Sequence, residues 1–125
     1  MNTPTIVAIT FDSSDALALA AFWSEALHRP LADGGSSDFA QIDGAPALMF
    51  YAVPEGKTAK NRVHLDIDVS DLASETDRLI GLGAKRLADF DEHGFVWTTL
   101  ADPDGNEFDL VAGSEPDPGG ATSGS

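Results

Sequence analysis

One order of secondary-structure signals occurs twice in this chain of 125 residues. Each copy begins with a strand-forming segment, continues into a helix that follows an aspartate, and ends in three shorter strand segments. The aspartates that precede the helices are Asp15 and Asp71, which are 71 − 15 = 56 positions apart. Two copies at this spacing are too few for a solenoid. The pattern instead predicts an α+β domain over residues 1–112, built from two βαβββ modules.

The first module is predicted over about residues 5–53. Its opening segment is β-branched and aromatic, Asp15 is a favourable N-cap residue, and the residues after it are rich in Ala and Leu. That helix is apolar nearly all round, so we expect it to be buried on more than one side. Asp43-Gly44 between two apolar runs predicts a hairpin. The expected elements are a strand at 5–11, a helix at 15–27, a weakly signalled strand at 30–32, and strands at 39–42 and 46–53.

The second module is predicted over about residues 61–112. Its first segment alternates strictly between polar and apolar residues, which predicts a strand with His64 and Asp66 on its polar face. Gly83 is well placed to end the helix that follows. The expected elements are a strand at 62–69, a helix at 71–82, and strands at 85–90, 95–100 and 107–112, the last two joined by a type I turn at Asp102-Pro103-Asp104-Gly105.

The helix of each module is expected to cover one face of its sheet and to leave the other face open. Two open faces can enclose a cavity, which is where ligands generally bind. The expected architecture is therefore a cupped mixed β-sheet with a helix on the outer face of each half. In that arrangement, the polar face of the strand at 62–69 points into the cavity.

The composition disfavours several classes of function. The formal net charge is −14, from 21 acidic and 7 basic residues, and such a surface repels nucleic acids and anionic membranes. The sequence has no cysteine and no P-loop, dinucleotide-binding or nucleophile-elbow motif. It shows no secretory signal and no apolar run longer than residues 16–23, so the expected location is the cytoplasm. Residues 113–125, almost all Gly, Ser, Pro and acids, are predicted to be a disordered tail.

Four segments of the chain carry a family resemblance. They are Ala21-Phe22-Trp23 with Glu25-Ala26-Leu27, Val53 to Thr58, Asn61 to Asp66, and Asp102 to Phe108. Together they resemble the vicinal oxygen chelate superfamily of glyoxalase I, extradiol dioxygenases and fosfomycin and bleomycin resistance proteins, and most closely its glyoxalase-like domain subgroup. The resemblance spans about residues 5–112, and it implies a small-molecule site and, by analogy, a homodimer.

The resemblance also bears on metal binding. Catalytic members of the superfamily hold a divalent metal through side chains on four strands, usually His or Gln, Glu, His and Glu. By position, the resemblance assigns the second-half histidine to His64 and the final carboxylate to Asp109. The other two positions fall near residues 7–8 and near Met49 or Tyr51, none of which is an imidazole or carboxylate. Two ligands alone hold a divalent ion poorly, so we expect no cofactor, with a divalent metal at His64 and Asp109 as the alternative.

His64 is the leading candidate for chemistry. A histidine flanked by carboxylates can act as a general base or an orienting donor, with Asp66 tuning it. The simpler interpretation is a binding residue or a hydrogen-bonded remnant of a lost metal site. Asp109 joins His64 only if both face the same cavity; otherwise it is a polar edge or a partner of Arg62. Arg62 itself belongs to a basic segment at 57–62, which is either an anion-binding rim or a solvated loop.

Aromatic residues and methionine on the strands are candidates for the apolar lining. Trp97 with Met49, Phe50 and Tyr51 can line a stacking pocket, although core packing accounts for most aromatic residues on strands. The predicted catalytic residues, if the protein is an enzyme, are His64 and Asp109. The predicted ligand-binding residues are Met49, Tyr51, Arg62, His64, Asp66, Trp97 and Asp109.

The leading hypothesis is a metal-independent protein that binds a small organic molecule, as the drug-sequestering members of the superfamily do. The alternative is a lyase, isomerase or dioxygenase-type enzyme that acts near His64 and Asp109, with or without a divalent metal. A third hypothesis is a protein–protein interaction module that keeps only the fold. Metal content separates the enzyme from the binding protein, and thermal stabilisation by a ligand tests binding directly.

Overall fold

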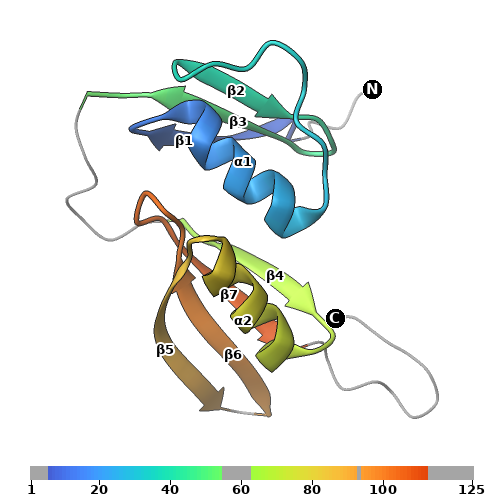
Figure 1. Ribbon diagram of the computed structural model, residues 1–125. Coiled ribbons are helices and arrows are strands. Elements are labelled where there is room, and N and C mark those ends of the chain that lie inside the picture. The colour runs from blue at the N-terminus through green and yellow to red at the C-terminus, as the bar shows by residue number, and fades with distance from the viewer. Residues whose placement is uncertain (1–5, 55–62, 93, 113–125) are drawn as a thin grey trace, which may run out of the picture. The chain divides into compact units, whose positions relative to one another are not determined.

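The computed structural model describes residues 6–54, 63–92 and 94–112 (Figure 1). The chain divides into two compact units, Met1–Lys57 and Thr58–Ser125. Within the described residues, each unit contains one helix and one mixed β-sheet, which confirms the α+β class. Neither helix in this part of the chain is long and apolar enough to cross a membrane. The predicted tail at 113–125 lies outside the described residues.

The first unit contains β1 (Ala8–Ser13), α1 (Ala16–Leu27), β2 (Phe39–Ile42) and β3 (Ala47–Ala52). The sheet order is β1-β3-β2, with β1 parallel and β2 antiparallel to β3. The predicted strand at 30–32 is reduced to a single bridge between Leu31 and Ile42. Pro30 has no backbone N–H to donate, so the ladder does not extend through it. The hairpin predicted at Asp43-Gly44 joins β2 to β3.

Helix α1 begins and ends as the local sequence dictates. Asp15 is its N-cap and accepts a hydrogen bond of 3.1 Å from the backbone N–H of Ala18. The prediction that α1 is buried on more than one side is wrong for the side of the helix that carries Leu17, which is 37% exposed. Alanine on that side supports the helix through its propensity and needs no partner. The helix buries one broad stripe, made of Ala16, Leu19, Ala20, Phe22, Trp23 and Ala26.

The second unit contains β4 (Leu65–Val69), α2 (Leu72–Leu82), β5 (Lys85–Glu92), β6 (Phe95–Ala101) and β7 (Glu107–Ala112). The sheet order is β4-β7-β6-β5, with β4 parallel to β7 and the other neighbours antiparallel. Asp71 caps α2 by accepting a hydrogen bond of 3.1 Å from the Ser74 N–H. Gly83 ends the helix at φ 122°, as predicted, because this backbone conformation strongly favours glycine.

Each helix covers one face of its own sheet (Figure 1). Beneath α1, Leu48 and Phe50 of β3 are buried, and beneath α2, Phe108 and Leu110 of β7 are buried. Successive side chains on a strand point to opposite faces. The residues between and beside these buried positions therefore lie on the face away from the helix of the same unit, which we call the uncovered face of each sheet. Those faces carry the predicted site residues Met49, Tyr51, Asp66, Trp97 and Asp109.

Strand β5 forms one edge of the second sheet, and an ion pair marks that edge. Arg86 Nη2 lies 2.9 Å from both carboxylate oxygens of Asp89, and the Thr98 hydroxyl donates a hydrogen bond of 2.9 Å to Asp89 Oδ1. The Arg86 guanidinium, followed by Thr98, holds the pKa of Asp89 below its ordinary value. Charged groups on an edge strand also disfavour edge-to-edge aggregation.

Replacing Arg86 with alanine is expected to raise the pKa of Asp89, because the largest cause of its lowering is removed. Because this pKa is lowered in the folded state, the contribution of ionised Asp89 to folding stability is present above the ordinary aspartate pKa. It is lost as the pH falls through the lowered value. An NMR titration of the side-chain carboxyl carbons measures the change. Arg78→Ala, which removes a guanidinium paired with Glu75 on α2, is the control and should leave Asp89 unchanged; an equal shift in both variants would contradict the assignment.

Candidate functional site

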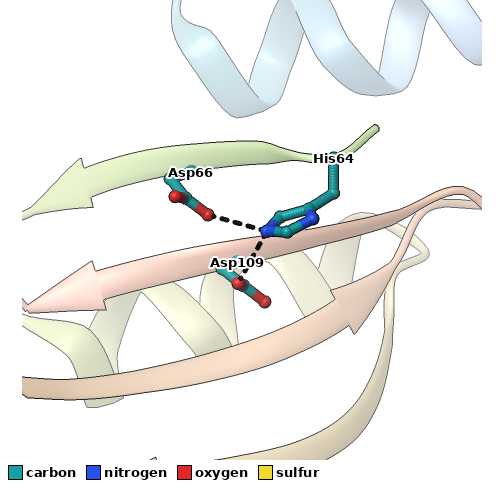
Figure 2. Close-up of side chains that lie close together, drawn as sticks. All are labelled: His64, Asp66 and Asp109. Atoms are coloured by element: carbon teal, nitrogen blue, oxygen red, sulfur yellow. Dashed lines mark ion pairs between the residues drawn. The ribbon is translucent and has the colours of Figure 1, made fainter. Parts of the chain in front are cut away.

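The uncovered face of the β4-β7-β6-β5 sheet brings together three of the predicted site residues. His64 directly precedes β4, Asp66 lies on β4, and Asp109 lies on β7. The parallel register places Asp66 opposite Asp109. His64 Nε2 lies 3.2 Å from Asp66 Oδ1 and 3.3 Å from Asp109 Oδ2, so one ring nitrogen faces both carboxylates (Figure 2). We call these three residues the His–Asp–Asp cluster.

Asp109 is the most enclosed member of the cluster. Its side chain is 16% exposed, against 52% for His64 and 64% for Asp66. Thr99 lies opposite Asp109 in the antiparallel β6–β7 pair, and its hydroxyl donates a hydrogen bond of 2.6 Å to Asp109 Oδ1. This bond fixes the carboxylate, and its other oxygen, Oδ2, faces His64. Asp109 is therefore a positioned acceptor, whereas His64 and Asp66 form the accessible side of the cluster.

An aromatic stack lies beside the cluster on the same face of the sheet. Trp97 shares its face with Thr99, two positions further along β6, and Phe90 lies opposite Trp97 on β5. The two rings are nearly parallel, with centroids 4.9 Å apart and an interplanar angle of 17°. Positions i and i+2 of a strand are about 7 Å apart. The face therefore combines an aromatic pair with hydrogen-bonding groups within the reach of one small molecule.

The superfamily's four-ligand metal set does not fit this chain. Ile9 and Leu65 lie at the same distance in sequence before the helix caps Asp15 and Asp71. Ile9 pairs with Leu48 in the first unit, and Leu65 pairs with Phe108 in the second, so these two pairs match the modules to each other. By this register, Ala8 corresponds to His64 and Met49 to Asp109. Alanine offers no donor atom, and a thioether is a soft ligand that divalent oxygen-loving ions do not favour.

A three-donor set is nevertheless present in the second unit. His64, Asp66 and Asp109 each offer one ligand atom, and the three atoms lie within 4.8 Å of one another. An imidazole nitrogen and two carboxylate oxygens suit borderline divalent ions such as Mn²⁺, Fe²⁺ and Zn²⁺. The donor chemistry therefore fits a divalent cation held by this unit's residues, in a ligand set that differs from the pattern of the superfamily.

The remaining predicted residues fall elsewhere. Met49 and Tyr51 lie on the uncovered face of the first unit's sheet, where the Tyr51 ring packs against Phe39 with centroids 4.8 Å apart. For Phe50, the core-packing alternative is confirmed: it is fully buried beneath α1, and its ring stacks on Phe11 with centroids 5.0 Å apart. Alternation along β3 turns it away from its two neighbours. Arg62 and the rest of the basic segment at 57–62 lie outside the described residues. The convergence of Met49 and Tyr51 with Trp97 stays a prediction.

Sequence reasoning did not identify two residues of this face, Phe90 and Thr99. Both lie on strands that were predicted correctly, but their pairing across the sheet depends on register. The pairing of Thr99 with Asp109 can be predicted approximately from the sequence, because a short turn between two antiparallel strands fixes which residues lie opposite each other. The Phe90 position was not, because a register irregularity between Arg86 and Ala88 changes the pairing along β5.

Solved structures share this fold across most of the chain. An enzyme of the glyoxalase/bleomycin resistance protein/dioxygenase family from Burkholderia phytofirmans PsJN matches with TM-score 0.75 and 18% identity, covering 87% of this chain and 98% of its own. The bleomycin-binding protein of Streptomyces verticillus, complexed with copper(II)-bleomycin, matches with TM-score 0.63 and 20% identity, covering 90% and 99%. Lactoylglutathione lyase from Agrobacterium tumefaciens matches with TM-score 0.65 and 14% identity, covering 91% and 97%. These identities establish a common fold alone.

A comparison with curated protein sequences gives no match. The family model described as "Glyoxalase-like domain", in contrast, matches residues 8–111, which include every strand and both helices of the described structure except the last residue of β7. The chain therefore belongs to the glyoxalase-like domain family, within the vicinal oxygen chelate superfamily.

Proposed function

We propose that this protein binds a small organic molecule on the uncovered face of the β4-β7-β6-β5 sheet. The observation that carries the proposal is the diagonal position of Trp97, which stacks on Phe90, relative to Asp109 on the neighbouring strand. Small-molecule sites are typically apolar and aromatic surfaces with a few polar groups that fix the orientation of the ligand. The stack supplies the first property and the cluster supplies the second.

The charges on this face favour a neutral or cationic ligand with a flat ring system. Asp66 and Asp109 bring carboxylates to the face, and the whole chain carries a net charge of −14. An anionic ligand would have to overcome that field, whereas a cation over Trp97 gains attraction from the ring. The copper(II)-bleomycin complex of the Streptomyces verticillus relative supports, by analogy, the use of this fold to bind an organic compound.

A thermal-shift screen of flat heteroaromatic compounds, followed by calorimetry of the hits, tests the proposal. A compound that binds the native state raises the melting temperature. Replacing Trp97 with alanine is expected to weaken the binding of a hit about tenfold or more, because the loss of an aromatic contact costs about 1.4 kcal/mol or more. Ile80→Ala, at a position 39% exposed on α2, is the control. Hits that bind equally well to the Trp97 variant would exclude this face as the site.

A second candidate function, from a different class, is catalysis of a lyase, isomerase or dioxygenase type near His64 and Asp109. The observation that favours it is the placement of His64 Nε2 between two carboxylates, an arrangement able to accept or donate a proton at one atom. Turnover of a hit from the screen, lost in His64→Gln with the affinity of binding retained, would identify an enzyme. Binding without turnover supports the first proposal.

The other expectations about partners stay predictions. These are a homodimer, the absence of nucleic-acid and membrane partners, a cytoplasmic location, and contributions of Met49, Tyr51 and Arg62 to ligand binding. Light scattering on the eluting protein measures the oligomeric state directly. A mass of one chain of 13.1 kDa at working concentration would exclude the dimer.

A further inference from the structure

We propose that Asp66 completes a divalent-cation site made by the second unit's residues, with His64 Nε2, Asp66 Oδ1 and Asp109 Oδ2 as the ligands. This inference concerns the same His–Asp–Asp cluster as the proposed function, but its test needs no organic ligand. The superfamily pattern accounts for His64 and Asp109 but not for Asp66, and the positions that would supply its other ligands carry Ala8 and Met49. Asp66 is therefore the residue on which the inference depends.

The two carboxylates of the cluster repel each other. Asp66 and Asp109 lie directly opposite each other on neighbouring strands and on the same face of the sheet. Like charges in such a pair are destabilising, and the chain as a whole is strongly acidic. His64 reaches both carboxylates through the same nitrogen. A positive charge at that point relieves the repulsion between the two carboxylates. A divalent ion carries more positive charge than a proton on the imidazole does.

The spacing of the donor atoms around His64 matches that of ligands on a metal ion. Metal–ligand bonds of about 2.1 Å separate neighbouring ligand atoms by about 3.0 Å in an octahedron and about 3.4 Å in a tetrahedron. The two N···O separations at His64, 3.2 and 3.3 Å, fall between these values. Asp66 and Asp109 each offer one carboxylate oxygen, and these two atoms and a His64 ring nitrogen lie within 4.8 Å of one another. A modest rotation of the exposed Asp66 side chain brings its oxygen to ligand spacing.

The groups around the three ligands also suit an ion. The Thr99 hydroxyl occupies Oδ1 of Asp109 and so orients the carboxylate, as the outer partners of metal ligands commonly do. The ring of His64 is 52% exposed, which leaves room for water or another molecule on an ion held there. One imidazole and two carboxylates favour Mn²⁺, Fe²⁺ or Zn²⁺ over ions that need all-oxygen or thiolate sets.

The test uses the full chain without a polyhistidine tag, stripped with a chelator and dialysed. Titration with Mn²⁺ followed by electron paramagnetic resonance, and with Zn²⁺ by calorimetry, is expected to give one ion per chain. Asp66→Asn should lower both affinities at least tenfold. Asp68→Asn is the matched control, because it removes the same charge from an exposed residue two positions along β4. Its affinities should stay within about twofold of the unaltered chain.

The outcomes separate specific binding from general attraction to an acidic surface. Absence of a saturable site in the unaltered chain overturns the inference. So does an equal loss of affinity in the Asp66 and Asp68 variants, which would identify nonspecific attraction. Far-UV circular dichroism checks that both variants fold, and Thr99→Val, expected to weaken binding severalfold while keeping all three ligands, tests the orientation of Asp109 separately. Because the readout needs no organic compound, its failure leaves the Trp97 experiment unaffected.

Discussion

Replacing Phe50 with alanine is expected to lower the free energy of unfolding of the first unit by about 3–5 kcal/mol, the usual cost of deleting a buried aromatic ring. Phe50 is fully buried, and its ring stacks on Phe11 with centroids 5.0 Å apart. Phe11 in turn contacts Trp23 at 5.5 Å, so the deletion opens a cavity at the centre of the packing beneath α1. Urea denaturation followed by far-UV circular dichroism measures the change.

Tyr51→Ala is the matched control for this prediction. Tyr51 is the next residue on β3, it is similar in size, and it is 44% exposed on the opposite face of the sheet. Its removal should cost about 1 kcal/mol or less. Each unit holds one of the two tryptophans, Trp23 in the first and Trp97 in the second, so the total tryptophan fluorescence reports the unfolding of both units. Equal destabilisation by the two variants would show that the two faces of β3 do not differ in burial.

The elements of this fold could be predicted because their causes are local in sequence. Both helix caps, at Asp15 and Asp71, accept the hydrogen bonds expected of them, and β2 and β7 have the predicted bounds. Hydrophobic alternation and cap residues act over a few positions, so a single sequence contains the information. The weak segment at 30–32 was the exception, since its pairing with β2 is limited to one bridge.

The site could be predicted only in part, because cross-strand pairing is not local. His64, Asp66 and Asp109 were all named, but the meeting of Asp66 with Asp109 depends on the parallel register of β4 and β7. A shift by one residue would turn every side chain of one strand to the other face. Phe50 shows the opposite case. Because successive side chains on a strand alternate between its faces, Phe50 cannot share a face with Met49 and Tyr51. The sequence alone therefore favours core packing for Phe50.

The turn between β6 and β7 is what fixes the register of Asp109, and Asp102 holds that turn together. Asp102 is 3% exposed. Its Oδ1 accepts hydrogen bonds from the backbone N–H groups of Asp104 and Asn106 at 3.0 and 2.9 Å, and its Oδ2 accepts one from the Asn106 side chain at 3.0 Å. Three donors thus converge on one enclosed carboxylate, and the first paired residues beyond the turn are Ala101 and Glu107.

Asp102→Ala is therefore expected to lower the free energy of unfolding of the second unit by about 2–4 kcal/mol, because enclosed donors lose a charged acceptor. Urea denaturation followed by far-UV circular dichroism measures the loss. Asp102→Asn keeps one oxygen as an acceptor and should lose clearly less. Amide exchange should also accelerate in β6 and β7, including at Thr99, since the turn no longer holds their register. A variant as stable as the unaltered chain would mean that the β6–β7 ladder sets the register by itself, and that the turn follows from the sheet.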